Sequence, residues 1–159
     1  MASIFAEVRA LHILVAAAWF GAAAFLTLYL MPALGQLGPQ GAPVLRALDG
    51  RRFHRFMAAN AGLTLLSGGW LYWVLTAGFS PQVVASRSGV VFGIGGLAGV
   101  LAAVIGASLV GGSAKRLAGL SSPAPETVAI LQRRIRTGSR LALTLMLLAL
   151  LAMTLGHAA

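Results

Sequence analysis

The sequence predicts an all-α integral membrane protein, a single domain over residues 1–159 built as an up-down bundle of four transmembrane helices. Three observations lead to this fold class. Hydrophobic residues make up 58% of the chain and the mean hydropathy is +0.88. Charged residues make up only 9%, whereas a soluble domain carries about 25%. The apolar residues also fall into four stretches, each near the roughly 20 residues that cross the hydrocarbon core.

The four apolar stretches are expected to be the membrane spans. They cover about residues 8–31, 57–77, 89–112 and 141–156. Pro32 closes the first stretch, Gly78 and Pro81 follow the second, and the fourth is the shortest. Apart from Arg9 in the first turn, none of them contains Asp, Glu, Lys or Arg. Because a charge within hydrocarbon is costly, this distribution is typical of spans.

Two of the connections carry helical patterns of their own. After Pro43, the apolar residues of the connection 33–56 recur at helical spacing, which predicts a short interfacial helix. In the connection 113–140, Glu126 opens another helix, with its charge at the favourable end of the dipole. Leu131 and Ile135 share one face of that helix. We expect it to lie at the membrane surface and to merge into the fourth span.

The basic residues predict the orientation. Ten of the twelve lie in the first and third connections: Arg46, Arg51, Arg52, Arg55, Lys115, Arg116, Arg133, Arg134, Arg136 and Arg140. The positive-inside rule places both connections in the cytoplasm and both termini outside, N-out and C-out. The formal net charge of +9 is thereby explained by topology and by contact with anionic lipids. No nucleic-acid partner is needed.

His12 is the first candidate for chemistry, because it is an ionisable residue inside the first span. Trp19 follows seven residues later on the same helical face, so it joins His12 as a candidate cofactor-binding residue. Three interpretations of His12 stay open. It is a neutral histidine bonded to a neighbouring helix, a haem or metal ligand, or a group that handles protons.

Met153 and His157 extend this candidate site. They lie four residues apart on the fourth span, and the predicted topology brings them to the same outer end as His12. Imidazole and thioether together suit copper, and the same groups ligate haem iron. The sequence therefore predicts a joint metal site of His12, Met153 and His157. The alternatives are ordinary packing for Met153 and a solvated chain end for His157.

Small and polar residues mark two further faces. Gly89, Gly93, Gly95 and Gly99 belong to a glycine-rich third span, which predicts close helix packing within the chain or a homodimer. On the second span, polar residues at helical spacing predict interhelical hydrogen bonds. They are Asn60, Thr64 and Ser67. The nearby aromatic residues Trp70, Tyr72 and Trp73 are typical of an interfacial belt.

Several local features carry a family resemblance. They are Leu11-His12, Trp19-Phe20-Gly21 and Pro32 in the first span, the Arg-Phe-rich run 51–56, Ser67-Gly68-Gly69, the basic pair Lys115-Arg116, and Arg140. Together they resemble the four-helix bacterial membrane proteins related to the copper-resistance D (CopD) family. The resemblance implies a multi-pass protein of the bacterial cytoplasmic (inner) membrane that handles metal through His and Met. That group is similar to the HemJ-type protoporphyrinogen oxidases, whose first-span histidine is implicated in haem binding; the corresponding residue is His12.

The expected function is a non-catalytic membrane protein with an outer-side haem b or copper site centred on His12. A haem-dependent membrane oxidoreductase is the enzymatic alternative. A structural subunit that docks a partner through the third span is the other alternative. No phosphate loop or nucleophile elbow occurs, and no carboxylate lies within a span. These absences argue against a hydrolase and against a proton-coupled transporter.

Overall fold

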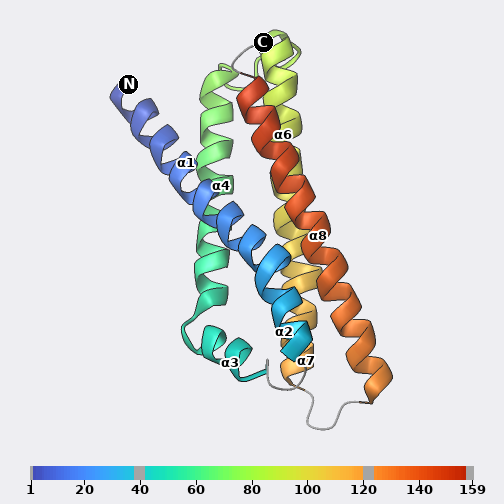
Figure 1. The fold of residues 1–159 in the computed structure, drawn as a ribbon. Helices are drawn as coiled ribbons and strands as arrows, with labels where there is room; N and C mark the ends of the chain where they lie inside the picture. Colours follow the sequence, from blue (N-terminus) through green and yellow to red (C-terminus); the bar gives the residue numbers. More distant parts are fainter. Residues whose placement is uncertain (1, 38–41, 120–123, 157–159) are drawn as a thin grey trace.

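The computed structural model describes residues 2–37, 42–119 and 124–156. Almost all of these residues are helical, and no strand occurs among them. The long helices lie side by side and successive ones run in opposite directions (Figure 1). The predicted all-α class is therefore confirmed. A helix suits such an apolar sequence because it satisfies its backbone hydrogen bonds within itself.

The first segment is longer than its apolar stretch. It consists of α1 (Ala2–Phe25), the π-helical turn η1 (Leu26–Leu30) and α2 (Met31–Leu37), which follow one another without a break. The Met31 N–H bonds to the Leu26 carbonyl, one residue further back than in an α-helix. Proline removes a donor and crowds the preceding turn, and the wider π turn accommodates it. The helix thus continues past Pro32, where the expected span ended.

The second segment begins with a sharp bend. The short helix α3 (Ala42–Gly50) lies across the lower end of α4 (Phe53–Leu75), so the helix expected after Pro43 is present (Figure 1). Between α3 and α4, Arg52 takes a left-handed conformation with φ of 58°. At the other end of α4 the chain turns through three residues of positive φ, 77–79, beside the fully buried Thr76.

The third and fourth segments are also continuous. After α5 (Pro81–Val84), the helix α6 (Arg87–Ile105) runs into the π-helical η3 (Gly106–Gly111) and α7 (Gly112–Ala118). The last helix, α8 (Pro125–Leu155), is a single helix of 31 residues. The helix that Glu126 opens therefore merges into the fourth apolar stretch, as predicted. It continues straight into α8, because Leu131 and Ile135 are buried where α8 packs along η3 and α7.

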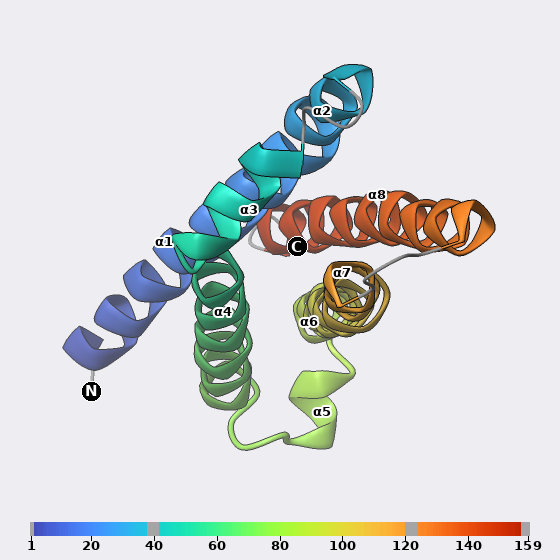
Figure 2. The same ribbon diagram turned by 90° about the horizontal axis from the view of Figure 1, so that it is seen from below.

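The helices pack in two main pairs, α1 with α4 and α6 with α8 (Figure 2). Contacts of α4 with α6 and of α1 with α8 join the pairs. The core where they meet is centred on Trp19, Ala102 and Met146. Tryptophan on one helix thus fills the space that a small alanine leaves on another.

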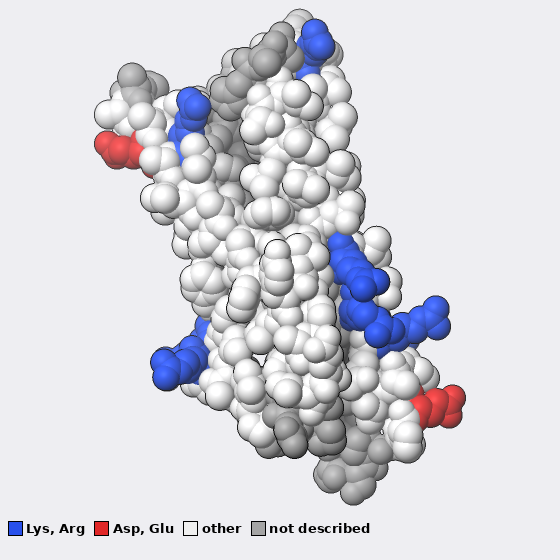
Figure 3. All heavy atoms as spheres, viewed as in Figure 1, with Lys and Arg blue, Asp and Glu red and all other residues white. Residues whose placement is uncertain are grey.

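Among the described residues, three helical stretches are long and apolar enough to cross a membrane: Ser3–Leu37, Arg87–Leu117 and Pro125–Leu155. With 31 to 35 residues each, they measure about 46–53 Å at 1.5 Å per residue. Hydrocarbon is about 30 Å thick, so each helix extends well beyond it. Polar residues lower the hydropathy of α4, which is not among the three. Basic side chains gather over the lower half of α8 (Figure 3).

Candidate functional site

His12 projects from α1 onto the backbone of α4. Its Nδ1 lies 3.1 Å from the Thr64 carbonyl oxygen and 3.0 Å from the Ser67 hydroxyl. A carbonyl oxygen only accepts hydrogen bonds, so Nδ1 must carry the proton in this arrangement. In the neutral ring, Nε2 then has a lone pair. Among the described residues, Nε2 has no hydrogen-bond partner.

Ser67 and Thr64 owe their positions to bonds within α4. The Ser67 hydroxyl is buried and donates to the Leu63 carbonyl, which leaves its oxygen to accept from His12. The Thr64 hydroxyl donates to the Asn60 carbonyl at 2.7 Å. Interhelical bonding by the polar stripe is thus confirmed at Ser67. Asn60 and the Thr64 hydroxyl instead bond to carbonyls one turn back on their own helix.

Gly68 makes room for the imidazole. A Cβ at this position would lie 2.8 Å from Cε1 of His12, closer than real Cβ contacts come. A Cβ at the next residue, Gly69, would have nothing within 4 Å. The His12 ring therefore lies in a notch that only a glycine at position 68 leaves open. From the sequence, Ser67-Gly68-Gly69 was used only for the family resemblance, and this role of Gly68 was not predicted. A glycine directly beside the polar residue Ser67 was the feature that could have indicated it.

Aromatic residues lie nearer the upper end of the same helix pair. The rings of Phe5 on α1 and Trp70 on α4 approach with centroids 6.4 Å apart. Tyr72 instead turns toward α6, where its hydroxyl donates to the Gly89 carbonyl at 3.1 Å. Trp73 is about half exposed. The three aromatic residues of the expected belt thus have different surroundings, and Trp70 is the one that contacts α1.

Trp19 lies deeper in the molecule than His12. It is only 7% exposed and belongs to the core with Ala102 and Met146. Met57 and Ala61 of α4 pack against the same core. This packing accounts for the tryptophan as a core residue, and its role beside a cofactor stays a prediction.

The other predicted ligands have separate surroundings. The methyl group of Met153 packs on Gly95, with its Cε 3.1 Å from where a glycine Cβ would lie, so Met153 faces α6. His12 faces α4. His157 lies outside the described residues. Within those residues, no three His, Cys, Asp or Glu side chains gather in a way that could hold a metal ion. The joint site of His12, Met153 and His157 stays a prediction.

Neither family models, curated proteins nor solved structures yield a match to this chain. The arrangement of His12, Thr64, Ser67 and Gly68 is therefore the basis for a functional proposal.

Proposed function

We propose that the chain crosses the bacterial cytoplasmic membrane four times, with α4 as the second span and both termini outside. The 23 residues of α4 give about 34 Å, enough for the hydrocarbon core. Its polar side chains are bonded to backbone carbonyls, which lowers their cost in lipid. The ends of α4 and α8 that carry most basic residues lie at the same end of the molecule, which favours a cytoplasmic location there (Figure 1).

A reporter fused after Ala159 tests the orientation. An enzyme that is active only outside the cytoplasm should be active in this fusion. A cytoplasmic reporter in the same position should be silent. The reverse pattern would overturn the orientation.

We propose further that His12 presents Nε2 to a metal centre in the outer half of the membrane, with haem iron the better candidate. The hydrogen bond from Nδ1 to the Thr64 carbonyl carries this proposal. Metal-bound histidines commonly donate their other ring N–H to a carbonyl, which fixes the tautomer and orients the ring. Ser67 and the Gly68 notch support the same ring position.

The donor set favours haem over copper. Haem would need as little as one imidazole from the protein, because the porphyrin itself supplies four nitrogen ligands to the iron. Copper in proteins takes several imidazole or sulfur ligands, and among the described residues no three His, Cys, Asp or Glu side chains gather around a common point. When bound, haem would supply one-electron chemistry. The residues of this chain would hold the ring, fix the Nδ1 proton and leave Nε2 free to bind.

The absorption spectrum of protein purified from haem-replete cells tests this proposal. We expect a Soret band that is lost in His12→Ala. His54→Ala is the matched control, since His54 lies at the opposite end of α4, and it should keep the band. A colourless preparation without bound metal by elemental analysis would overturn both the haem and the copper proposals.

A second candidate function is a structural membrane subunit without a cofactor. It is favoured by the fit of the His12 ring to Ser67 and Gly68, since an interhelical bond alone would explain a histidine in that place. The proposed homodimer through the third span belongs to this alternative. Gly96, on that segment, has open space around it and is free for such a contact. A colourless, metal-free protein that runs as a dimer would favour this function.

A further inference from the structure

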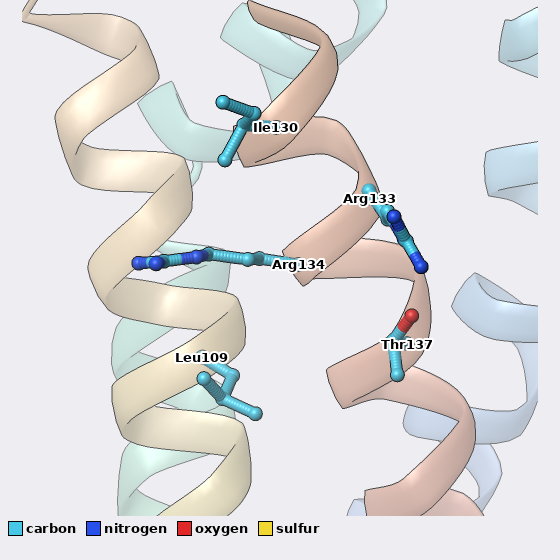
Figure 4. Close-up of a pocket in the computed structure, with 5 residues that line it drawn as sticks. All are labelled: Leu109, Ile130, Arg133, Arg134 and Thr137. Atoms are coloured by element: carbon cyan, nitrogen blue, oxygen red, sulfur yellow. The ribbon is translucent and has the colours of Figure 1, made fainter. Parts of the chain in front are cut away.

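An open groove of about 380 Å³ lies between η3 and α8. Its lining consists of Leu109 on η3 and four residues of α8: Ile130, Arg133, Arg134 and Thr137. Figure 4 shows Arg134 reaching from α8 toward the neighbouring helix that carries Leu109, with Arg133 on the other flank of α8. The groove thus combines an apolar wall, two guanidinium groups and a hydroxyl.

Close packing just beside the groove fixes its shape. A Cβ on Gly138 would lie 2.8 Å from the Leu109 Cβ and 3.2 Å from a Val110 methyl, so α8 and η3 touch there. One and two turns earlier on α8, the larger side chains of Arg134 and Ile130 take the place of the glycine. The helices η3 and α8 therefore touch at the Gly138 end of the groove. At the other end, the side chains of Arg134 and Ile130 line the opening.

The two guanidinium groups lack a protein counter-ion. Within the described parts of the chain, no ion pair involves Arg133 or Arg134. Glu126, the acidic residue of α8, lies about two turns before them. An arginine without a counter-ion is a good site for phosphate, because the planar guanidinium binds phosphate oxygens in a bidentate way. Arg134 is the one that reaches over the groove toward the helix of Leu109 (Figure 4).

The proposed topology places this groove at the inner boundary of the hydrocarbon. The predicted third span, 89–112, contains Leu109 near its inner end, and the predicted fourth span, 141–156, begins about one turn after Thr137. Leu109 therefore lies at the edge of the acyl chains, Thr137 lies just outside it, and Arg133 and Arg134 lie about one turn further out, at headgroup level.

We propose that this groove binds one anionic glycerophospholipid, with its phosphate at Arg134 and an acyl chain along Leu109, while Arg133 adds positive charge at the same depth on the other flank of α8. A phospholipid is the occupant because the positive charge and the apolar wall adjoin at the depth where a lipid has its phosphate and its first methylenes. The proposal rests on the membrane topology above and not on a cofactor at His12.

Lipid binding measured by native mass spectrometry tests the groove. The purified protein is titrated with phosphatidylglycerol carrying palmitoyl and oleoyl chains. Each guanidinium near the membrane surface contributes about fivefold in affinity. Arg133→Gln/Arg134→Gln should therefore weaken binding about 25-fold. The matched control Arg51→Gln/Arg55→Gln loses the same charge at the same end of the molecule, and its affinity should change less than about twofold.

Three outcomes would overturn the proposal. An equal loss in the control would show diffuse attraction to the whole basic end. Equal affinity for phosphatidylcholine would show that charge is not recognised. Displacement of the lipid by millimolar inorganic phosphate would show a site for a small anion. Arg134→Lys, which keeps the charge but loses the bidentate fork, should lose less than Arg134→Gln. Because the readout is bound lipid, absence of haem leaves these results unchanged.

Discussion

The two main helix pairs are held together in different ways. In the pair α6–α8 small residues bring the helices close: a Cβ on Gly95 would lie 2.9 Å from the Ala152 Cβ, and one on Gly156 would meet the Phe92 ring at 2.7 Å. In the pair α1–α4 the His12 imidazole lies against Gly68, where a Cβ would come within 2.8 Å of Cε1. In the pair α6–α8, glycines let the neighbouring helix approach closely. In the pair α1–α4, the space left by a glycine is filled by the polar His12 ring.

The difference bears on function. Lipid tails are as apolar as leucine, so helices associate in a membrane by close packing, and a polar side chain adds little to that association. The pair α6–α8 shows that this chain can join two helices with glycine, alanine and methionine. The association of α1 with α4 therefore does not require a histidine at their contact. An ionisable residue at such a position is expected to have a function of its own.

The largest effect is expected at the closely packed pair. Gly95→Val places two methyl groups where Ala152 and Met153 already lie, and overpacking of this kind costs about 1–3 kcal/mol. Gly96→Val is the matched control, because a Cβ there has nothing within 4 Å. The measurement is the free energy of unfolding in mixed micelles. Equal stability of the two variants would mean that α6 and α8 are not held by close packing.

A smaller effect is expected at the pair α1–α4. Gly68→Ala brings a methyl group against Cε1 of His12, but the imidazole can rotate away at a cost of about 1 kcal/mol. Gly69→Ala, with open space around it, should leave the free energy of unfolding unchanged. If haem binds, Gly68→Ala should also reduce haem loading, because the ring leaves its oriented position. A loss as large as that of Gly95→Val would contradict the comparison.

The sequence was sufficient to predict those features that depend on composition and on the helical spacing of apolar and polar residues. It predicted the helical class, the helix after Pro43 and the polar contact of Ser67, because periodicity shows which residues share a helix face. It could not show how each helix is rotated toward its neighbours. In the structure His12 bonds to α4 and Met153 packs on Gly95 of α6, contacts that periodicity alone does not give. Their joint metal site stays a prediction.

Helix continuity was a second limit of the sequence. Proline predicts a helix end, yet the π turn η1 accommodates Pro32 and the helix continues to Leu37. The segment after Glu126 had an apolar face typical of a surface helix. The predicted merger of this segment with the fourth span is confirmed in α8, but the burial of its apolar face against η3 and α7 could not be read from the sequence. In both places the outcome depends on neighbouring helices, which local pattern does not describe.

The smallest expected effect concerns the hydrogen bond between His12 and Ser67. A double-mutant cycle with His12→Phe, which keeps a ring over Gly68, and Ser67→Ala should give a coupling energy of about 0.6 kcal/mol, the average for such bonds in membranes. Ser67→Ala leaves the Thr64 carbonyl to accept from Nδ1, so this variant should keep a Soret band if haem binds. A coupling above about 2 kcal/mol would exceed such bonds and make His12 a structural residue first. A small coupling together with loss of the band in His12→Ala would separate the two roles, because the histidine would then matter for the ligand and not for the fold.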